Sequence, residues 1–342
     1  MDASPNVDYS KPVDLFSQQA RNRRRSAWLI AGFILFFAWL GFGGDYILYL
    51  STQGGEPEEY KHVIPWLGIV LTLVGAGMAI HAWRSGASDV LKSTGARQIF
   101  TPKGEVEQQY VNVVEEMAIA SGITCPGIWI VDDPDPNAFA TGRDPENAHI
   151  AVTEGLLLSI DRSELQAVVA HEMGHIKNLD VRLMTLLAAL VGTIVLLSDV
   201  LWRVVFRSGM KAGGRSRKKD NNPLIIVLLV VWLISWLLAP IIVRLIALSL
   251  SREREYLADA MSAQFTRNPL ALASALEKIE HAAEPTRQIK RGTAHLCIAD
   301  PLGRRINEKE TWLAARFATH PPMAIRVARL KAMGYRSLKA TG

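Results

Sequence analysis

The chain has 342 residues, of which 38 are Lys or Arg and 33 are Asp or Glu, and 49% of all residues are hydrophobic. This composition excludes a disordered chain and a fibrous one. The net charge of +5 does not indicate a nucleic-acid partner, because many basic residues flank apolar blocks. The two cysteines, Cys125 and Cys297, lie far apart in the sequence, and we expect both to be unpaired in a reducing compartment.

Four apolar blocks predict an integral membrane protein in contact with the lipid bilayer. They span residues 26–44, 63–83, 183–198 and 223–243. A run rich in arginine at 21–25 precedes the first block, so we expect an uncleaved helix with a cytosolic N-terminus. The acidic loop 51–62 fits the outer side, and the second block then returns the chain to the cytosol at Arg84.

The blocks divide the chain into five predicted parts. These are a cytosolic tail (1–25), two membrane helices (26–83), a first polar stretch (84–181), an apolar helical hairpin (182–250) and a second polar stretch (251–342). The depth of the hairpin stays open. Its first block is shorter than the roughly 20 residues that span a bilayer, and its basic loop breaks the positive-inside rule if it does span. A spanning hairpin and a partly inserted one are both consistent with the sequence.

The first polar stretch is expected to contain helices and strands. Apolar residues recur at helical spacing over 105–120, and short β-branched runs at 127–131 and 149–153 predict strands. A turn-rich loop at 132–137 separates the two runs. Ser163-Glu-Leu-Gln166 has the spacing of a capping box, which predicts the start of a helix that continues through Met173.

The second polar stretch is mostly helical by its pattern. Asn268-Pro269 is typical of an N-cap followed by proline at the first helical position. Pro321-Pro322 is expected to start a final helix that runs through Leu330. The predicted fold class is therefore mostly α, with membrane helices and an α+β domain whose small sheet lies in the first stretch.

The sequence His171-Glu-Met-Gly-His175 lies within the helix predicted to begin at Ser163. Its spacing puts two imidazoles one turn apart on one helical face, which suits two ligands of a single Zn²⁺. Glu172 lies beside them, where it would take a proton from a water that the metal activates. Gly174 costs about 1 kcal/mol relative to alanine in a helix, so it indicates close approach by another segment. An ordinary helix with partly buried histidines is the alternative.

A catalytic zinc needs a third protein ligand, and two regions offer one. Asp180 is nearest in sequence, but it lies about 180° around the helix from His171, so we interpret it as a helix-end charge beside Arg182. Glu255 and Asp259 are four residues apart and would share one helical face. One would ligate zinc and the other would orient a histidine, or both would pair with neighbouring arginines on a solvated helix.

Several motifs together resemble the HtpX-type membrane zinc endopeptidases, which are relatives of the CAAX prenyl proteases. They are the loop PNAFATG at 136–142, TEGLL at 153–157, HEMGH at 171–175, SREREYLADA at 251–260 and THPPMAIR at 319–326. This combination, in matching order, is far more specific than H-E-x-x-H alone. The resemblance implies a zincin-like catalytic domain, assembled from the two polar stretches and facing the cytosol, in the cytoplasmic (inner) membrane of a bacterium.

The resemblance also implies which residues form the metal centre. His171, His175 and Glu255 are expected to bind one Zn²⁺ per chain, and Glu172 is expected to act as the general base. Asp259 matches the acid that orients a histidine ligand from the second shell.

Three further positions match residues that face the substrate in this family. Asn137 is expected beside the substrate strand, and His320 and Arg326 are expected opposite the attacking water. The expected reaction is hydrolysis of peptide bonds in an extended polypeptide that pairs with an edge strand near 137–153. The resemblance suggests misfolded membrane proteins as substrates. Taken without the resemblance, these three residues are typical of a turn, a helix cap and a surface charge.

A non-catalytic membrane scaffold with a structural zinc is the main alternative function. Glu172 argues against it, because a structural site does not use a base beside two ligands. A transporter is a second alternative, but intramembrane charges such as Asp45 and Asp199 are few. The sequence sets neither the oligomeric state nor the cleavage preference.

Overall fold

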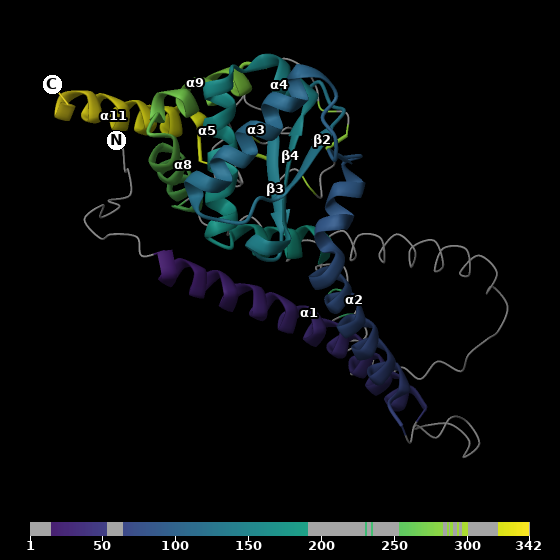
Figure 1. Ribbon diagram of the computed structural model, residues 1–342. Helices are drawn as coiled ribbons and strands as arrows, with labels where there is room; N and C mark the ends of the chain where they lie inside the picture. Colours follow the sequence, from purple (N-terminus) through teal and green to yellow (C-terminus); the bar gives the residue numbers. More distant parts are fainter. Residues whose placement is uncertain are drawn as a thin grey trace.

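Two long helices, α1 (Leu15–Thr52) and α2 (Trp66–Ser93), pack against each other and project from a unit of helices and strands, as Figure 1 shows. The computed structural model describes residues 15–52, 64–190, 230, 234, 253–282, 286, 288, 289, 293, 296–299 and 321–341. The remaining described elements are β1 (Arg97–Gln98), α3 (Gly104–Ser121), β2 (Gly127–Val131), β3 (Ala138–Gly142), η1 (Pro145–Asn147), β4 (Ala148–Thr153), α4 (Glu154–Ser159), α5 (Arg162–Lys177), α8 (Glu253–Thr266), α9 (Pro269–Glu280) and α11 (Met323–Thr341).

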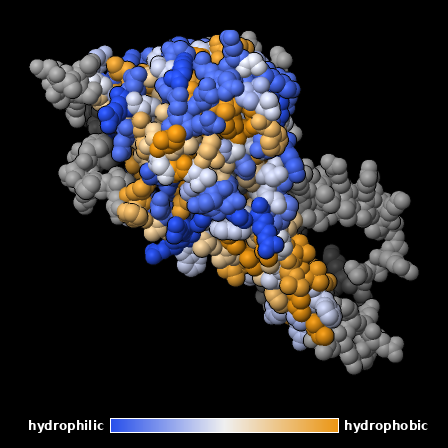
Figure 2. All heavy atoms as spheres, viewed as in Figure 1, coloured by the Kyte–Doolittle hydropathy of each residue, from blue (hydrophilic) through white to orange (hydrophobic). Residues whose placement is uncertain are grey.

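Helices α1 and α2 are long and apolar enough to cross a membrane, over Leu15–Leu50 and Trp66–Ser93. Hydrophobic residues cover the outer half of this projecting pair in Figure 2. The two helices approach closely, since a Cβ added at Gly75 would lie 2.7 Å from the Cβ of Phe37. The first two apolar blocks therefore form the helices that the sequence predicts.

The N-terminal boundary differs from the prediction. Helix α1 begins at Leu15, so the predicted boundary at residue 26 falls inside it, and the buried side chains of Asn22 and Ser26 face the protein. The predicted hairpin 182–250 lies outside the described residues except for 182–190, 230 and 234, and its first turns, 182–190, continue a helix.

The sheet has four strands in the order β1-β2-β4-β3, with β3 at one edge. Strands β2 and β4 are parallel, with Ile128 opposite Ile150, and β3 runs antiparallel to β4, with Phe139 opposite Ala151. The two predicted strands are confirmed to within one residue, whereas β1 and β3 were not predicted. Strand β3 lies in the segment interpreted as a loop. Its alanines and glycine have low strand propensity, and its pairing with β4 and the burial of all five residues determine its conformation.

Helix α5 lies at the centre of the domain, in contact with α3, α8, α9 and the sheet. The core between them contains fully buried residues from each layer, among them Tyr110, Ile150, Val168 and Leu276. The predicted helices at 105–120 and after Pro322 are confirmed as α3 and α11. The side chain of Asn268 accepts a hydrogen bond from the backbone N–H of Ala271 and caps α9, as predicted.

Candidate metal centre

The start of α5 is stabilised by a capping box that differs from the predicted one. Asp161 accepts hydrogen bonds from the backbone N–H groups of Ser163 (2.8 Å) and Glu164 (2.9 Å). The Glu164 side chain in turn accepts from the backbone N–H of Asp161 at 2.8 Å. The predicted pair Ser163/Gln166 was wrong, because the Asp161 carboxylate takes both backbone donors and Ser163 already lies inside the first turn.

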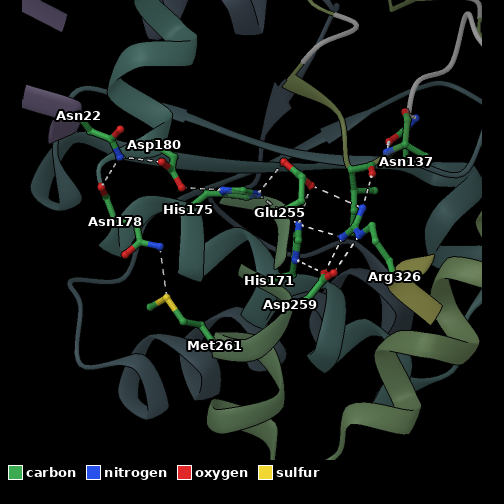
Figure 3. A network of polar contacts seen from close by, with 12 residues as sticks. Asn22, Asn137, His171, His175, Asn178, Asp180, Glu255, Asp259, Met261 and Arg326 are labelled. Atoms are coloured by element: carbon green, nitrogen blue, oxygen red, sulfur yellow. Dashed lines mark hydrogen bonds and ion pairs between the residues drawn. The ribbon is translucent and has the colours of Figure 1, made fainter. Parts of the chain in front are cut away.

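Helix α8 crosses α5 at Gly174. A Cβ added at this glycine would lie 3.3 Å from the Cα of Ala258 and 3.4 Å from the Cβ of Met261. This close approach confirms the interpretation of Gly174 as a packing position. The crossing places Glu255 and Asp259 opposite the two histidines of α5 (Figure 3).

Three side chains converge where the two helices cross. The Nε2 atoms of His171 and His175 lie 3.2 Å apart. The two carboxylate oxygens of Glu255 lie 3.7 Å from them, Oε2 from His171 Nε2 and Oε1 from His175 Nε2. One ligand atom from each of the three residues falls within 4.8 Å of the other two. His171 and Glu255 are buried, and His175 is partly buried.

This set of donors suits a metal ion. Two imidazoles and a carboxylate are typical ligands of catalytic Zn²⁺. Each histidine has a carboxylate next to its Nδ1 atom, which favours the proton there and leaves the Nε2 lone pair facing the centre. Once His175 has lost its Nε2 proton, two Nε2 lone pairs lie 3.2 Å apart and repel each other, and a cation between the three groups would remove that repulsion.

The two histidines differ in basicity. Burial lowers the pKa of His171 to about 4, despite the neighbouring Asp259, so this imidazole is neutral at pH 7. Burial also lowers the pKa of His175, but the hydrogen bond to Asp180 and the charge of Glu255 have the larger combined effect and raise this pKa to about 9. A metal ion would therefore bind at His175 in exchange for a proton.

Glu172 lies next to the three donors with its side chain buried, and it lines the same cavity as His175 and Glu255. Its Oε1 atom has no hydrogen-bond partner within the described part of the chain. Burial raises the pKa of Glu172 to about 7. A carboxylate with this pKa can both accept and return a proton near neutral pH.

Asp259 and Arg326 form a buried pair behind His171. The Oδ1 atom of Asp259 lies 3.0 Å from His171 Nδ1. Arg326 is fully buried and donates to both oxygens of Asp259, from Nε at 2.9 Å and from Nη2 at 2.6 Å. Its Nη1 atom lies 3.5 Å from Glu255. Asp259 therefore lies where it can hold the ring of His171 and the guanidinium of Arg326 together, and both Glu255 and Asp259 are buried rather than solvated.

Asp180 also belongs to the centre, contrary to its interpretation as a helix-end charge. Its Oδ2 atom lies 3.2 Å from His175 Nδ1, and its Oδ1 atom accepts a hydrogen bond of 2.7 Å from Asn22 of α1. The angular argument failed because α5 ends at Lys177 and Leu179 has a positive φ of 59°, so the chain turns back before Asp180. No sequence pattern relates Asn22 to this site, since 158 residues separate it from Asp180.

Of the other two residues predicted to face the substrate, Asn137 and His320, the structure describes only Asn137. Asn137 is fully buried at the start of β3, where its side-chain amide donates to the carbonyl of Ala299 at 3.0 Å. His320 lies outside the described residues. Cys125 is exposed and Cys297 is buried, and no disulfide joins them.

The chain is similar to one known protein family and to several individual proteins. The model of the family "Peptidase family M48" matches residues 105–334. A Protease HtpX homolog of Dictyoglomus turgidum is 40% identical over 326 residues, which cover 95% of this chain and 97% of the relative. Another, from Caldanaerobacter subterraneus, is 46% identical over 229 residues, covering 66% and 73% of the two chains. Among solved structures, Ste24p of S. mikatae matches 93% of this chain and 66% of its own, with 17% identity and a TM-score of 0.40.

Proposed function

Since the chain belongs to peptidase family M48 and is a membrane protease, we propose that it is a zinc endopeptidase with His171, His175 and Glu255 as ligands and Glu172 as general base. One observation carries this proposal. The two histidines of α5 and the glutamate of α8 turn one donor atom each toward a common point, and a buried carboxylate with a raised pKa lies beside them.

The chemistry follows from these residues. A zinc ion held by the three donors would supply a Lewis acid for the scissile carbonyl. Glu172 takes a proton from the attacking water and transfers it to the amine that leaves, and a pKa of about 7 suits both transfers. Asp259 and Asp180 hold the rings of His171 and His175, respectively, so that each Nε2 atom faces the metal.

Arg326 and Asn137 are proposed to hold the substrate backbone. Arg326 keeps Nη1 directed at a backbone carbonyl, that of Ile298, while its other nitrogens bind Asp259. This contact favours a role in holding a substrate carbonyl over a role as donor to the oxyanion. His320, which also comes from the family pattern, is proposed as that oxyanion donor.

The substrates are polypeptides, as for any protease, and we propose misfolded membrane proteins among them. Asn22 of α1 donates to Asp180, the neighbour of His175, so the active site lies close to the helices that are proposed to cross the bilayer. The arginine-rich run at 21–25 supports a cytosolic active site in the cytoplasmic membrane of a bacterium. A non-catalytic scaffold with structural zinc does not account for a buried base with a raised pKa at the site.

Metal removal and return test this function. The purified protein in detergent should hydrolyse an unfolded model substrate, lose this activity after dialysis against a chelator and regain it with one equivalent of Zn²⁺. Hydrolysis that continues after the metal is removed would refute the zinc assignment.

A further inference from the structure

Residues 296–299 lie along the edge of the sheet beside the metal centre. The backbone N–H of Ile298 donates to the carbonyl of Ala138 at 2.9 Å, and Cys297 forms an antiparallel bridge with Phe139. This short segment therefore extends the sheet beyond β3, at the edge where an extended substrate would be expected to pair.

The two residues proposed to hold substrate backbone hold this segment instead. The side-chain amide of Asn137 donates to the carbonyl of Ala299 at 3.0 Å, and its oxygen accepts from the N–H of the same residue at 3.4 Å. Arg326 donates to the carbonyl of Ile298 at 3.1 Å. Because every one of these bonds goes to main-chain atoms, the same contacts would hold any extended peptide that replaced the segment.

The register relates the segment to the reacting groups. Since Cys297 is opposite Phe139, the next residue along β3, Ala140, is opposite Leu296. The backbone of Ala140 faces the carboxylate of Glu172, and Leu296, Cys297 and Ile298 line the same cavity as Glu172, His175 and Glu255. The base therefore lies on the amino-terminal side of Ile298, and a peptide in this register would present the residue at the Ile298 position on the carboxyl side of the cleaved bond.

We propose that Leu296–Ala299 occupies the place of the substrate strand, so that the chain shields its own active site and substrate must displace this segment. The inference rests on the proposed function and extends it to selectivity. The Ile298 side chain is only 2% exposed and is packed in the main core. The site therefore selects substrate segments with a branched aliphatic residue at this position on the carboxyl side of the cleaved bond.

Displacement is tested with Ile298→Ala, and Ile289→Ala is the matched control. Ile289 is similarly buried and belongs to the same hydrophobic cluster as Phe139, Leu296 and Cys297, but its backbone N–H donates to Thr286 and no hydrogen bond described for it reaches β3, Asn137 or Arg326. Ile298→Ala should raise kcat/KM for an unfolded model substrate by about 10-fold, in the range of lost apolar contacts in a pocket, at unchanged zinc content. Ile289→Ala should leave it near the wild-type value. Equal values of kcat/KM for the two variants would overturn the proposal that substrate displaces Leu296–Ala299.

Selectivity is tested on the Ile298→Ala protein with two peptides of the sequence of residues 293–300. Both carry Ser at the Cys297 position; one keeps Ile at the next position and the other has Asp there. The Ile peptide should compete with the model substrate at least about 10-fold better than the Asp peptide. Equal competition, or none by either peptide, would overturn the assignment. A wild-type protein without chelator-sensitive hydrolysis would instead refute the proposed function, so the two failures are distinct.

Discussion

Asn22, in the first turns of the membrane helix α1, donates a hydrogen bond of 2.7 Å to Asp180, and the other oxygen of this carboxylate lies 3.2 Å from His175 (Figure 3). The same amide of Asn22 reaches the carbonyl of Asn178 at 3.0 Å, just beyond the end of α5. A residue that precedes the first apolar block is thus part of the support of a proposed metal ligand.

Loss of this support should weaken metal binding. Asn22→Ala and Asp180→Ala should each raise the dissociation constant for Zn²⁺ by about 10- to 100-fold, the usual effect of removing a partner of a ligand. Competition with a chromophoric chelator measures this constant. Gln19→Ala is the matched control, because Gln19 donates from α1 to the carbonyl of Lys177 at 2.7 Å without touching Asp180. An equal loss of zinc affinity in Gln19→Ala would show that the docking of α1, and not the hydrogen bond to Asp180, supports the metal site.

The contact between α5 and α8 should not accept a branched side chain. Gly174→Val should lower the free energy of unfolding by about 1–3 kcal/mol and reduce zinc affinity, because it forces Ala258, and with it Glu255, away from the histidines. Thermal unfolding and zinc content give the two readouts. Gly77→Val, at a position with nothing within 4 Å of an added Cβ, should leave zinc content unchanged.

The cap of α5 should make stability depend on pH. Hydrogen bonds from the backbone of Glu164 and the side chain of Ser163 lower the pKa of Asp161. The contribution of Asp161 to the free energy of unfolding is fully present above the pKa of an unfolded aspartate, about 3.9. It is lost as the pH falls through the lower pKa of Asp161 in the folded protein. Asp161→Ala should therefore cost about 1 kcal/mol at neutral pH. The difference in unfolding temperature between variant and wild type should shrink in acid, and a difference that is constant with pH would contradict this origin.

Topology can be measured with a membrane-impermeant thiol reagent. In a protein with Cys125→Ser, a cysteine at the exposed Ala120 of α3 should react only from the cytosolic side. A cysteine at Tyr49, 41% exposed near the far end of α1, should react only from outside. If the cysteine at Ala120 reacted only from outside and the cysteine at Tyr49 only from the cytosol, the protein would have the opposite orientation in the membrane.

Parts of the fold that follow local rules were predictable from the sequence. The periodicity of α3, the Asn268 cap and the H-E-x-x-H spacing are encoded within a few residues, and the structure reproduces each. The E-x-x-x-D spacing predicts that Glu255 and Asp259 share one helical face, but no local pattern favours zinc ligation over solvated ion pairs. The crossing of α8 at Gly174 provides that reason.

Features that depend on contacts distant in sequence were missed. Strand β3 has a weak strand pattern and is held by β4 and by residues 297–298. The position of Asp180 depends on where α5 ends, and that of Asn22 on how α1 docks against the domain. Because side chains 158 residues apart meet only in the folded chain, no periodicity could have paired these two residues.

The most direct test of the account is the Glu172→Gln variant. The amide has nearly the same shape as the carboxylate but cannot take a proton from water, so the variant should bind one equivalent of zinc with wild-type affinity. Its hydrolysis of an unfolded model substrate should fall by at least about 100-fold, the size of a lost general base. Hydrolysis at the wild-type rate with zinc bound would contradict the assignment of Glu172 as the base.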